Sequence, residues 1–195
     1  MSQLGGYTGI PRDALAYLNA ADPASPDVFV RRNLPRVGLV DSGGDAHVAL
    51  ASGVMTSVPF YLVAGDQVSS ISAISGAVGA NAPTNQWAAL FSRDATPVLL
   101  GQSPDAGAAA WAANTIKSFA LAAPFRIPTT GFYTVGIMVV ATAAPSLIGA
   151  LGARPIPALG ERRLAQTSGA ALTTTAPATV ATPVVQNFVP YLVIS

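Results

Sequence analysis

Short apolar runs separated by turn residues occupy the chain from about residue 37 to residue 144. Runs of this length, bounded by Gly, Asp and Pro, are typical of antiparallel β-strands. The segments Ala64–Gln67, Ser92–Pro97 and Pro128–Gly131 combine residues that end a strand and reverse the chain. The pattern therefore predicts strands at His47–Ala51, Thr56–Ala64, Gln67–Ile74, Gln86–Ser92, Thr96–Gly101, Thr115–Ala122 and Gly131–Ala141.

One of these strands, Gln67–Ile74, follows a period of two only in part. In a regular strand Val68 and Ser70 share one face, whereas Ile71 and Ala73 share the other. A β-bulge, which inserts one extra residue, would exchange the two faces. Either pair is therefore a candidate for the buried side.

The C-terminal third of the chain is less regular. Residues 145–169 are loop-like with one helical turn expected at Ser146–Leu151, and Ala170–Pro183 reads as an extended connector rich in Thr, Ala and Pro. The last residues, Tyr-Leu-Val-Ile-Ser, predict a final strand that returns to the sheet, because a free apolar tail would promote aggregation. Together these features predict an all-β fold of about eight or nine strands, an antiparallel β-sandwich of jelly-roll type spanning residues 38–195.

Residues 1–37 form a different kind of segment. They are interrupted by Gly and Pro, and only Pro11–Asn19 has a helical pattern. One short helix cannot bury the large apolar side chains of this segment by itself. We expect an extended N-terminal arm that docks on a neighbouring protein, with Arg31 and Arg32 as rim contacts; the alternative is that the arm folds back over its own sandwich. The predicted docking residues are Tyr7, Ile10, Leu15, Tyr17, Leu18 and Phe29.

The composition indicates a surface that favours association. Of the 195 residues 10% are charged and the net charge is +1, whereas about 25% of residues are charged in an average soluble domain. So little charge repulsion predicts self-association, most simply as a homotrimer. Basic residues cluster only in pairs such as Arg31-Arg32, so nucleic-acid binding is not expected. The uncharged stretch 127–153 is broken by Gly and Pro, so no membrane insertion is expected, and the polar start of the chain predicts synthesis in the cytoplasm.

The sequence offers few groups for catalysis. The segment Asp41-Ser-Gly-Gly with His47 nearby is similar to the turn around a serine-protease nucleophile, but a triad takes its members from separated parts of a fold. Asp41 and Asp45 supply too few oxygen ligands for calcium. We therefore expect no enzymatic activity, no cofactor and no metal site. The remaining acidic residues of the β-region lie in turn sequences, where Asp usually bonds the backbone: Asp66, Asp94 and Asp105.

Two tryptophans are the candidates for ligand binding. Trp87 and Trp111 could stack on a glycan, with Asn85, Gln86 and Asp105 close in sequence. The alternative, which we favour, is that Trp87 packs at the rim of the core and Trp111 fills a contact between subunits, where Trp is enriched.

Four segments carry a resemblance to a known family. They are Val58–Ile71, Gln86–Asp94 followed by Val98–Ser103, Gly131–Val140 and the following loop Pro145–Gly149. In composition and strand order the region from His47 to Pro145 resembles small jelly-roll accessory proteins of tailed phages that infect actinobacteria, which occur as head-decoration, minor tail or tail-fibre components. The resemblance covers about half to two thirds of the chain. The use of nine Arg and one Lys also fits a GC-rich genome.

This resemblance implies a non-enzymatic structural protein of a bacteriophage virion. Such a protein would be made in the host cytoplasm and located in the virion, where it decorates the capsid head or forms part of the tail. Its N-terminal arm would bind major capsid or tail proteins, and trimers would be common. The alternative implied by the same resemblance is a receptor-binding or carbohydrate-binding module of a tail fibre that engages a host cell-surface glycan.

Overall fold

The computed structural model describes residues 31–34, 38–42, 50–151 and 163–195. These residues form thirteen β-strands and no helix. The all-β class is therefore confirmed, and the strands pair antiparallel throughout, as expected for a β-sandwich. The helix predicted at Pro11–Asn19 lies outside the described residues. Since the described part of the chain contains no helix, it also contains none that could cross a membrane.

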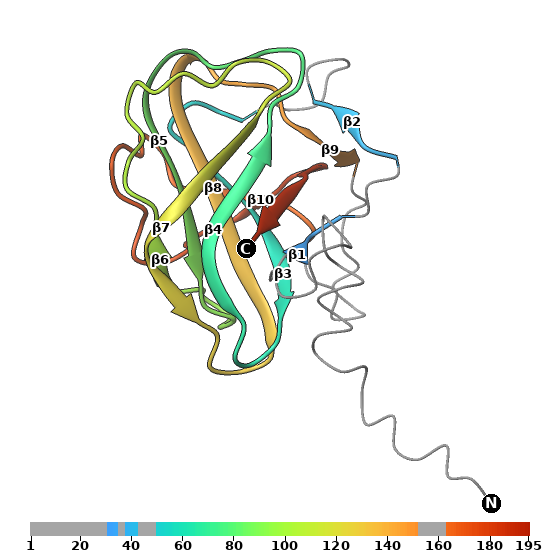
Figure 1. Cartoon of the computed structure of the whole chain (residues 1–195), viewed down its shortest axis with the longest axis vertical. Helices are drawn as coiled ribbons and strands as arrows, with labels where there is room; N and C mark the ends of the chain where they lie inside the picture. Colours follow the sequence, from blue (N-terminus) through green and yellow to red (C-terminus); the bar gives the residue numbers. More distant parts are fainter. Residues whose placement is uncertain (1–30, 35–37, 43–49, 152–162) are drawn as a thin grey trace, which may run out of the picture.

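Two larger sheets and one small sheet make up the fold (Figure 1). The four-stranded sheet has the order β1 (Arg31–Arg32), β13 (Leu192–Ile194), β4 (Gln67–Ile74) and β7 (Ile116–Arg126). The six-stranded sheet has the order β11 (Val184–Val185), β10 (Gln166–Ser168), β3 (Met55–Leu62), β8 (Gly131–Ala143), β5 (Asn81–Phe91) and β6 (Leu99–Gln102). The three-stranded sheet has the order β12 (Phe188–Pro190), β9 (Ile148–Leu151) and β2 (Val40–Asp41).

The main core lies between the two larger sheets. Alternate residues of each strand point into it, because side chains of a β-strand alternate between its faces. Burial of each large side chain of this kind stabilises the fold by about 1.5–3 kcal/mol. The strands contribute Val58, Phe60 and Leu62 from β3, Val135, Ile137 and Val139 from β8, Val68, Ile71 and Ala73 from β4, Phe119 and Leu121 from β7, and Leu192 and Ile194 from β13.

A bulge in β4 resolves its mixed pattern. The register with β7 shifts between Val68 and Ser70, and Val68, Ile71 and Ala73 are all buried. The backbone N–H groups of Ser69 and Ser70 both donate to the carbonyl oxygen of Ser195, at 2.6 and 2.8 Å. The extra residue thus places Val68 on the same buried side as Ile71 and Ala73, whereas Ser70 is only partly buried.

The C-terminal strand predicted from the sequence is confirmed. β13 lies between β4 and β1, with Leu192 opposite Ala73 and Ile194 opposite Arg31. Because β1 pairs with β13, residues 31–34 belong to the sandwich, and Leu34 packs against the main core. The segment predicted as an arm, residues 1–37, therefore includes the sheet strand β1.

Three local predictions are wrong or shifted. The helical turn expected at Ser146–Leu151 is instead strand β9, which pairs with β12 and β2, two segments far away in sequence. A Cβ atom at Gly149 would clash with the Val189 carbonyl and the Phe188 ring, so the close pairing needs glycine there. β5 begins at Asn81, earlier than predicted, and the described end of the strand expected at His47–Ala51 is not a strand.

Candidate functional site

A second apolar cluster lies on the outer face of the six-stranded sheet. It consists of Met55, Trp87, Ala89, Phe91 and Met138 from the sheet, with Ala176 and Val180. The last two belong to residues 169–183, which we call the cover segment. The sequence predicted residues 170–183 as a connector, but the chain here lies over the sheet and buries its outer face.

Hydrogen bonds hold the cover segment in place. The Trp87 indole Nε1–H donates to the Thr173 carbonyl at 2.7 Å. The Gln102 side chain binds the cover segment twice, donating to the Thr174 carbonyl at 2.8 Å and accepting from the Ala176 N–H at 2.7 Å. Near its end, the Val180 N–H donates to the Pro97 carbonyl at 2.9 Å. The cover segment is thus attached along its length to β5, β6 and the loop between them.

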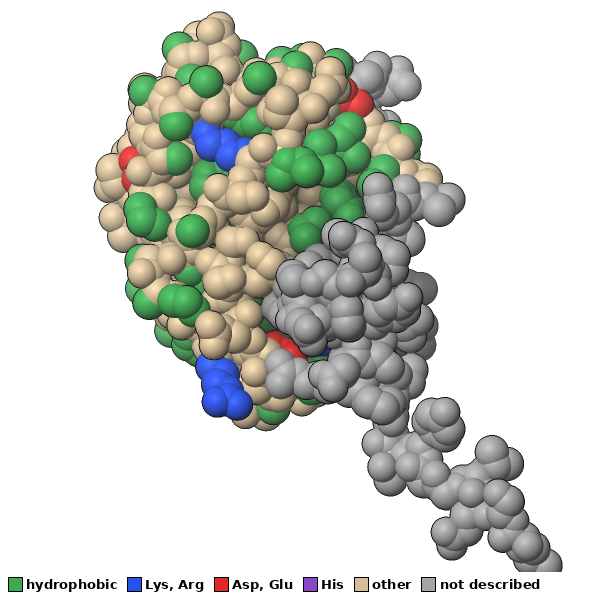
Figure 2. Space-filling model, viewed as in Figure 1, with side chains coloured by type: hydrophobic (Ala, Val, Ile, Leu, Met, Phe, Trp, Pro, Cys, Tyr) green, Lys and Arg blue, Asp and Glu red, His purple; other side chains and the backbone are tan. Residues whose placement is uncertain are grey.

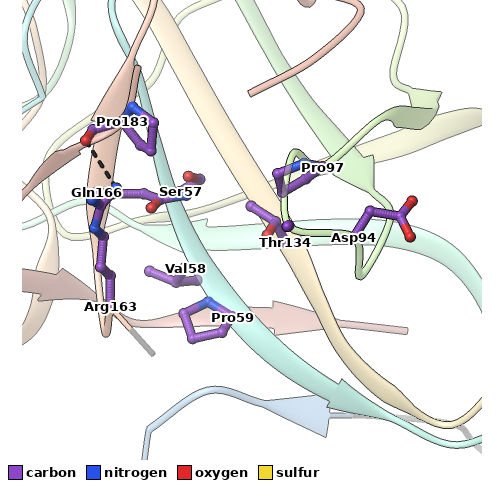
Figure 3. Close-up of a pocket in the computed structure, with 10 residues that line it drawn as sticks. Ser57, Val58, Pro59, Asp94, Pro97, Thr134, Arg163, Gln166 and Pro183 are labelled. Carbon is purple, nitrogen blue, oxygen red and sulfur yellow. Dashed lines mark hydrogen bonds between the residues drawn. The ribbon is translucent and has the colours of Figure 1, made fainter. Parts of the chain in front are cut away.

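Beside the cover segment, described residues on the outer face of the same sheet line a hollow of about 560 Å³ (Figure 3). Its floor is formed by Ser57 and Pro59 of β3 and Thr134 of β8. The loop between β5 and β6 lines one side, and residues next to β10 and β11 line the other. These side walls contain Asp94, Ala95 and Pro97 on the first side and Arg163, Gln166 and Pro183 on the second.

The polar groups of this hollow are held in defined positions. Ser57 is fully buried, and its Oγ has no hydrogen-bond partner. Asp94 Oδ2 accepts a hydrogen bond from Ser92 Oγ at 2.6 Å, and Ser92 Oγ in turn accepts one from the Val98 N–H at 2.9 Å. Across the hollow, Arg163 Nη1 donates to the Pro183 carbonyl at 2.9 Å. Asp94 and Arg163 thus lie on opposite walls of the hollow, and the Ser57 hydroxyl is buried in its floor.

An aromatic pair extends this hollow along the sheet. Tyr61 and Phe132 are 53% and 43% exposed, and their rings meet edge to face with centroids 5.1 Å apart. They line a second hollow of about 280 Å³ that shares Pro59 with the first. Ser57, Pro59 and Tyr61 alternate along one face of β3. We call the two hollows together the outer-face groove.

The tryptophans predicted as glycan or subunit contacts are buried instead. Trp87 lies beneath the cover segment, and Trp111 packs edge to face on Phe119 in the main core. Because both indoles are at most 2% exposed, neither offers a face for a sugar or a second subunit. The favoured prediction that Trp87 packs in the interior agrees with this burial, whereas the subunit contact predicted for Trp111 is corrected to interior packing. Among the described residues, the aromatic rings with the largest exposed fractions belong to Tyr61 and Phe132, and the sequence analysis missed both. The sequence signal that could have found them is an aromatic residue at a strand position that faces away from the core, in a strand whose apolar and polar residues alternate.

Asn85, Gln86 and Asp105 form a polar network that fixes a loop. Asp105 accepts hydrogen bonds from Asn85 Nδ2 at 2.6 Å, from the Gln86 N–H at 2.7 Å and from the Gly107 N–H at 3.0 Å. Burial raises the pKa of Asp105, but these three hydrogen bonds together hold it below its usual value. This carboxylate bonds its own loop, as Asp commonly does in turns.

The same network includes Lys117. Its Nζ donates to Gln86 Oε1 at 2.8 Å and to the Ala109 carbonyl at 2.9 Å. Burial lowers the pKa of Lys117. Gln86 itself is fully buried and donates to the Gly107 and Ala109 carbonyls. The contacts predicted at Asn85, Gln86 and Asp105 are therefore made within the chain.

Arg31 also contacts its own chain. It is buried, with Nη2 3.6 Å from Oδ2 of the fully buried Asp66. That same oxygen accepts a hydrogen bond from the Val63 N–H at 2.9 Å, so Asp66 serves its turn as expected. The prediction of Arg31 as a rim contact is corrected to an internal ion pair. Arg32 lines the outer-face groove beside Tyr61. The other predicted arm residues lie outside the described part of the chain: Tyr7, Ile10, Leu15, Tyr17, Leu18 and Phe29.

The segment around Asp41 and Ser42 ties loops together. Asp41 Oδ2 accepts a hydrogen bond from the Ala77 N–H at 2.5 Å, and Ser42 Oγ accepts one from the Leu147 N–H at 2.8 Å. Asp45 and His47 lie outside the described residues. Within residues 31–34, 38–42, 50–151 and 163–195, no group of three or more His, Cys, Asp or Glu side chains is close enough to hold a metal ion.

No protein-family model matches this chain, and no curated protein sequence matches it.

Proposed function

We propose that this chain is a non-enzymatic structural component of a phage virion that decorates the head or forms part of the tail. The observation that carries the proposal is the place of β1, the strand that follows residues 1–30 in the sequence. β1 is an edge strand of the four-stranded sheet, and the Arg31–Asp66 pair fastens it to the turn after β3. An apolar arm attached to a β-sandwich by such a fixed edge is suited to anchoring the sandwich on a larger particle.

The surface of the sandwich supports assembly. Figure 2 shows few and scattered charged side chains on the side of the four-stranded sheet. Large apolar side chains reach the surface on several elements, among them Ile116 of β7, Val184 of β11 and Leu151 of β9. A surface with so little charge lacks the repulsion that keeps domains apart, and it supports a homotrimer packed among capsid or tail proteins.

Three of the four described aspartates support a non-enzymatic role, and the fourth, Asp94, lines the outer-face groove. Asp66 and Asp105 accept hydrogen bonds from the backbone of their own turns, and Asp41 ties one loop to another. A general acid or base would instead be expected to point into a cleft with a pKa shifted toward neutrality. The lowered pKa of Asp105 is a shift in the opposite direction.

Deletion of residues 2–30 tests the anchoring role. This deletion leaves β1, Arg31 and Leu34 in place, so the truncated chain is expected to keep the melting temperature of its sandwich. Purified particles of the encoding phage are expected to contain the full chain and to lack the truncated one. A matched control keeps the length of the arm but replaces its apolar residues, Tyr7, Ile10, Leu15, Tyr17, Leu18 and Phe29, by Ser.

The control should also be lost from particles, because burial of six such side chains contributes on the order of 10 kcal/mol of gross docking energy. Absence of the full chain from purified particles would refute the virion role. Normal incorporation of both altered chains would refute anchoring through the arm.

A second candidate function is a receptor-binding or carbohydrate-binding module of a tail fibre. The outer-face groove favours it, because this groove combines hydroxyl, carboxylate and guanidinium groups with exposed aromatic rings. Binding of the full chain to host cell walls or to a glycan array discriminates this function from a purely structural one.

A further inference from the structure

We propose that the outer-face groove, from Ser57 to Tyr61 on the six-stranded sheet, binds a neutral oligosaccharide. This inference specifies the site and ligand class of the second candidate function and rests on it. It does not depend on the virion role, which a sugar-binding sandwich could have or lack.

The floor of the groove contains a buried hydroxyl group that lacks a partner. Ser57 Oγ is buried without a hydrogen bond, although native proteins satisfy the large majority of such groups. Thr134, nearly as buried, lies between the two walls in Figure 3. A hydroxyl can donate and accept, and so can each hydroxyl of a sugar. A ligand rich in hydroxyl groups therefore matches this floor.

The charges on the walls of the larger hollow favour a neutral ligand there. Asp94 and Arg163 stand on its opposite sides and are its charged lining residues, whereas the smaller hollow is lined by Arg32 and by Arg31, which is paired with Asp66. An anionic ligand would meet Asp94 and a cationic ligand would meet Arg163. A neutral sugar uses both, since a carboxylate accepts from hydroxyl donors and a guanidinium donates to two oxygen acceptors at once.

The aromatic end of the groove offers a surface for stacking. Tyr61 exposes about half of its surface next to Pro59, and Phe132 stands edge to face against it. Aromatic rings combine apolar faces with polar edges and suit ligands that do the same, as a sugar ring does with its C–H face and its hydroxyl rim.

Size and spacing indicate more than one sugar ring. The larger hollow, at about 560 Å³, lies within the range of roughly 300–1,000 Å³ typical of small-molecule sites. The smaller hollow continues it past Pro59 toward Tyr61. One ligand that reaches both the Asp94–Arg163 walls and the Tyr61 ring must be a short oligosaccharide.

The test is a titration of the full chain with chitotriose and maltotriose, preceded by a screen on a glycan array and read by calorimetry and saturation-transfer NMR. Tyr61→Ala is expected to weaken binding about tenfold through lost stacking. Asp94→Asn is expected to weaken it by about tenfold or more, because a charged acceptor is lost. The matched controls Ile116→Ala and Arg126→Gln, both on β7 in the other large sheet, should leave the affinity unchanged.

Ser57→Ala separates a ligand role from a structural one. Replacing a buried hydroxyl without a partner by a methyl group should raise the melting temperature. If that hydroxyl contacts the sugar, the same variant binds more weakly although it is more stable. If Ser57 had only a structural role, the variant would gain stability and its affinity for the sugar would not change.

Three results would overturn the proposal. The first is that no neutral glycan on the array binds the full chain at millimolar concentration. The second is that binding occurs but survives Tyr61→Ala, Asp94→Asn and Ser57→Ala. The third is that residues 1–30 occupy the groove of the full chain. In that case sugar binding appears only in the chain that lacks residues 2–30. Incorporation into particles is measured in a separate experiment. Failure of sugar binding at the groove can therefore be distinguished from failure of the virion role.

Discussion

The apolar cluster between the two large sheets and the cluster beneath the cover segment contain equally buried side chains, yet different backbone structures enclose them. The main core is closed by paired strands on both sides. The second cluster has the six-stranded sheet on one side and, on the other, residues 169–183, most of which form no strand. The difference explains why Gln86–Phe91 has no alternating pattern, since Trp87, Ala89 and Phe91 are buried on one face while Ala88 and Leu90 are buried on the other.

The outer face of β3 and β8 passes from covered to open within a few residues. Met55 and Met138 lie beneath the cover segment, Ser57 and Thr134 form the floor of the groove, and Tyr61 reaches the surface. A covered face stabilises the fold, whereas an open face that keeps polar groups in place is available to a ligand. The end of the cover segment thus sets where the groove begins.

The largest expected effect comes from emptying the second cluster. Trp87→Ala removes a fully buried indole and its bond to Thr173, and it should lower the free energy of unfolding by about 3–5 kcal/mol. Hydrogen exchange should show amides of residues 169–183 opening before those of β3 and β8, because the cover segment has few backbone pairs of its own. Urea denaturation and hydrogen exchange measure both effects. Simultaneous opening of all these segments would mean that the two clusters form one cooperative unit.

Crowding the second cluster should have a smaller effect. A Cβ atom at Gly136 would lie 2.5 Å from Met55 Sδ, so Gly136→Ala should destabilise the protein by about 1–3 kcal/mol through overpacking. The control is Gly101→Ala, whose Cβ meets only Leu121 Cδ1 at 3.7 Å, an ordinary contact. Thermal unfolding of both variants measures the difference. Equal melting temperatures would show that Met55 moves aside without cost.

A variant that weakens the attachment of the cover segment but keeps the side chains of the second cluster should lose less stability than the two variants above. Gln102→Ala removes the two hydrogen bonds to Thr174 and Ala176 and should lower the stability by about 1 kcal/mol. Limited proteolysis is expected to cut residues 169–183 faster, with the main core intact. An unchanged cleavage rate would indicate that apolar contacts alone hold the cover segment.

The polar network at Asp105 lies outside both clusters. A substitution there should cause the smallest loss of stability, and this loss should depend on pH. Asp105→Asn should cost about 1 kcal/mol at neutral pH, because Asn has one acceptor oxygen in place of two and its NH₂ would face either the Asn85 donor or the Gln86 and Gly107 donors. The pKa of Asp105 is depressed in the folded state, so its contribution is present above the unfolded pKa and is lost as the pH falls through the folded value. The difference in stability between the variant and the natural chain should therefore shrink in acid, as measured by urea unfolding at several pH values. A difference independent of pH would contradict this account.

The strands of the main core could be predicted from the sequence by itself. β3, β4 and β8 appear close to their observed bounds, and the terminal strand β13 follows from the apolar end of the chain. Alternation of side chains and the chemistry of tight turns are local properties, so a window of about ten residues contains the information that specifies them. The structural use of Asp66 and Asp105 was predictable for the same reason.

Only the tertiary structure decided which outer surfaces are buried and which are open. β9 is a strand because Ile148–Leu151 meets Phe188–Pro190 and Val40–Asp41, and the cover segment is ordered because Trp87, Gln102 and Pro97 receive it. These contacts join residues that lie tens of positions apart, and no local pattern encodes which pairs will meet. The burial of both tryptophans and the exposure of Tyr61 depend on such long-range contacts, and so does the place of the groove.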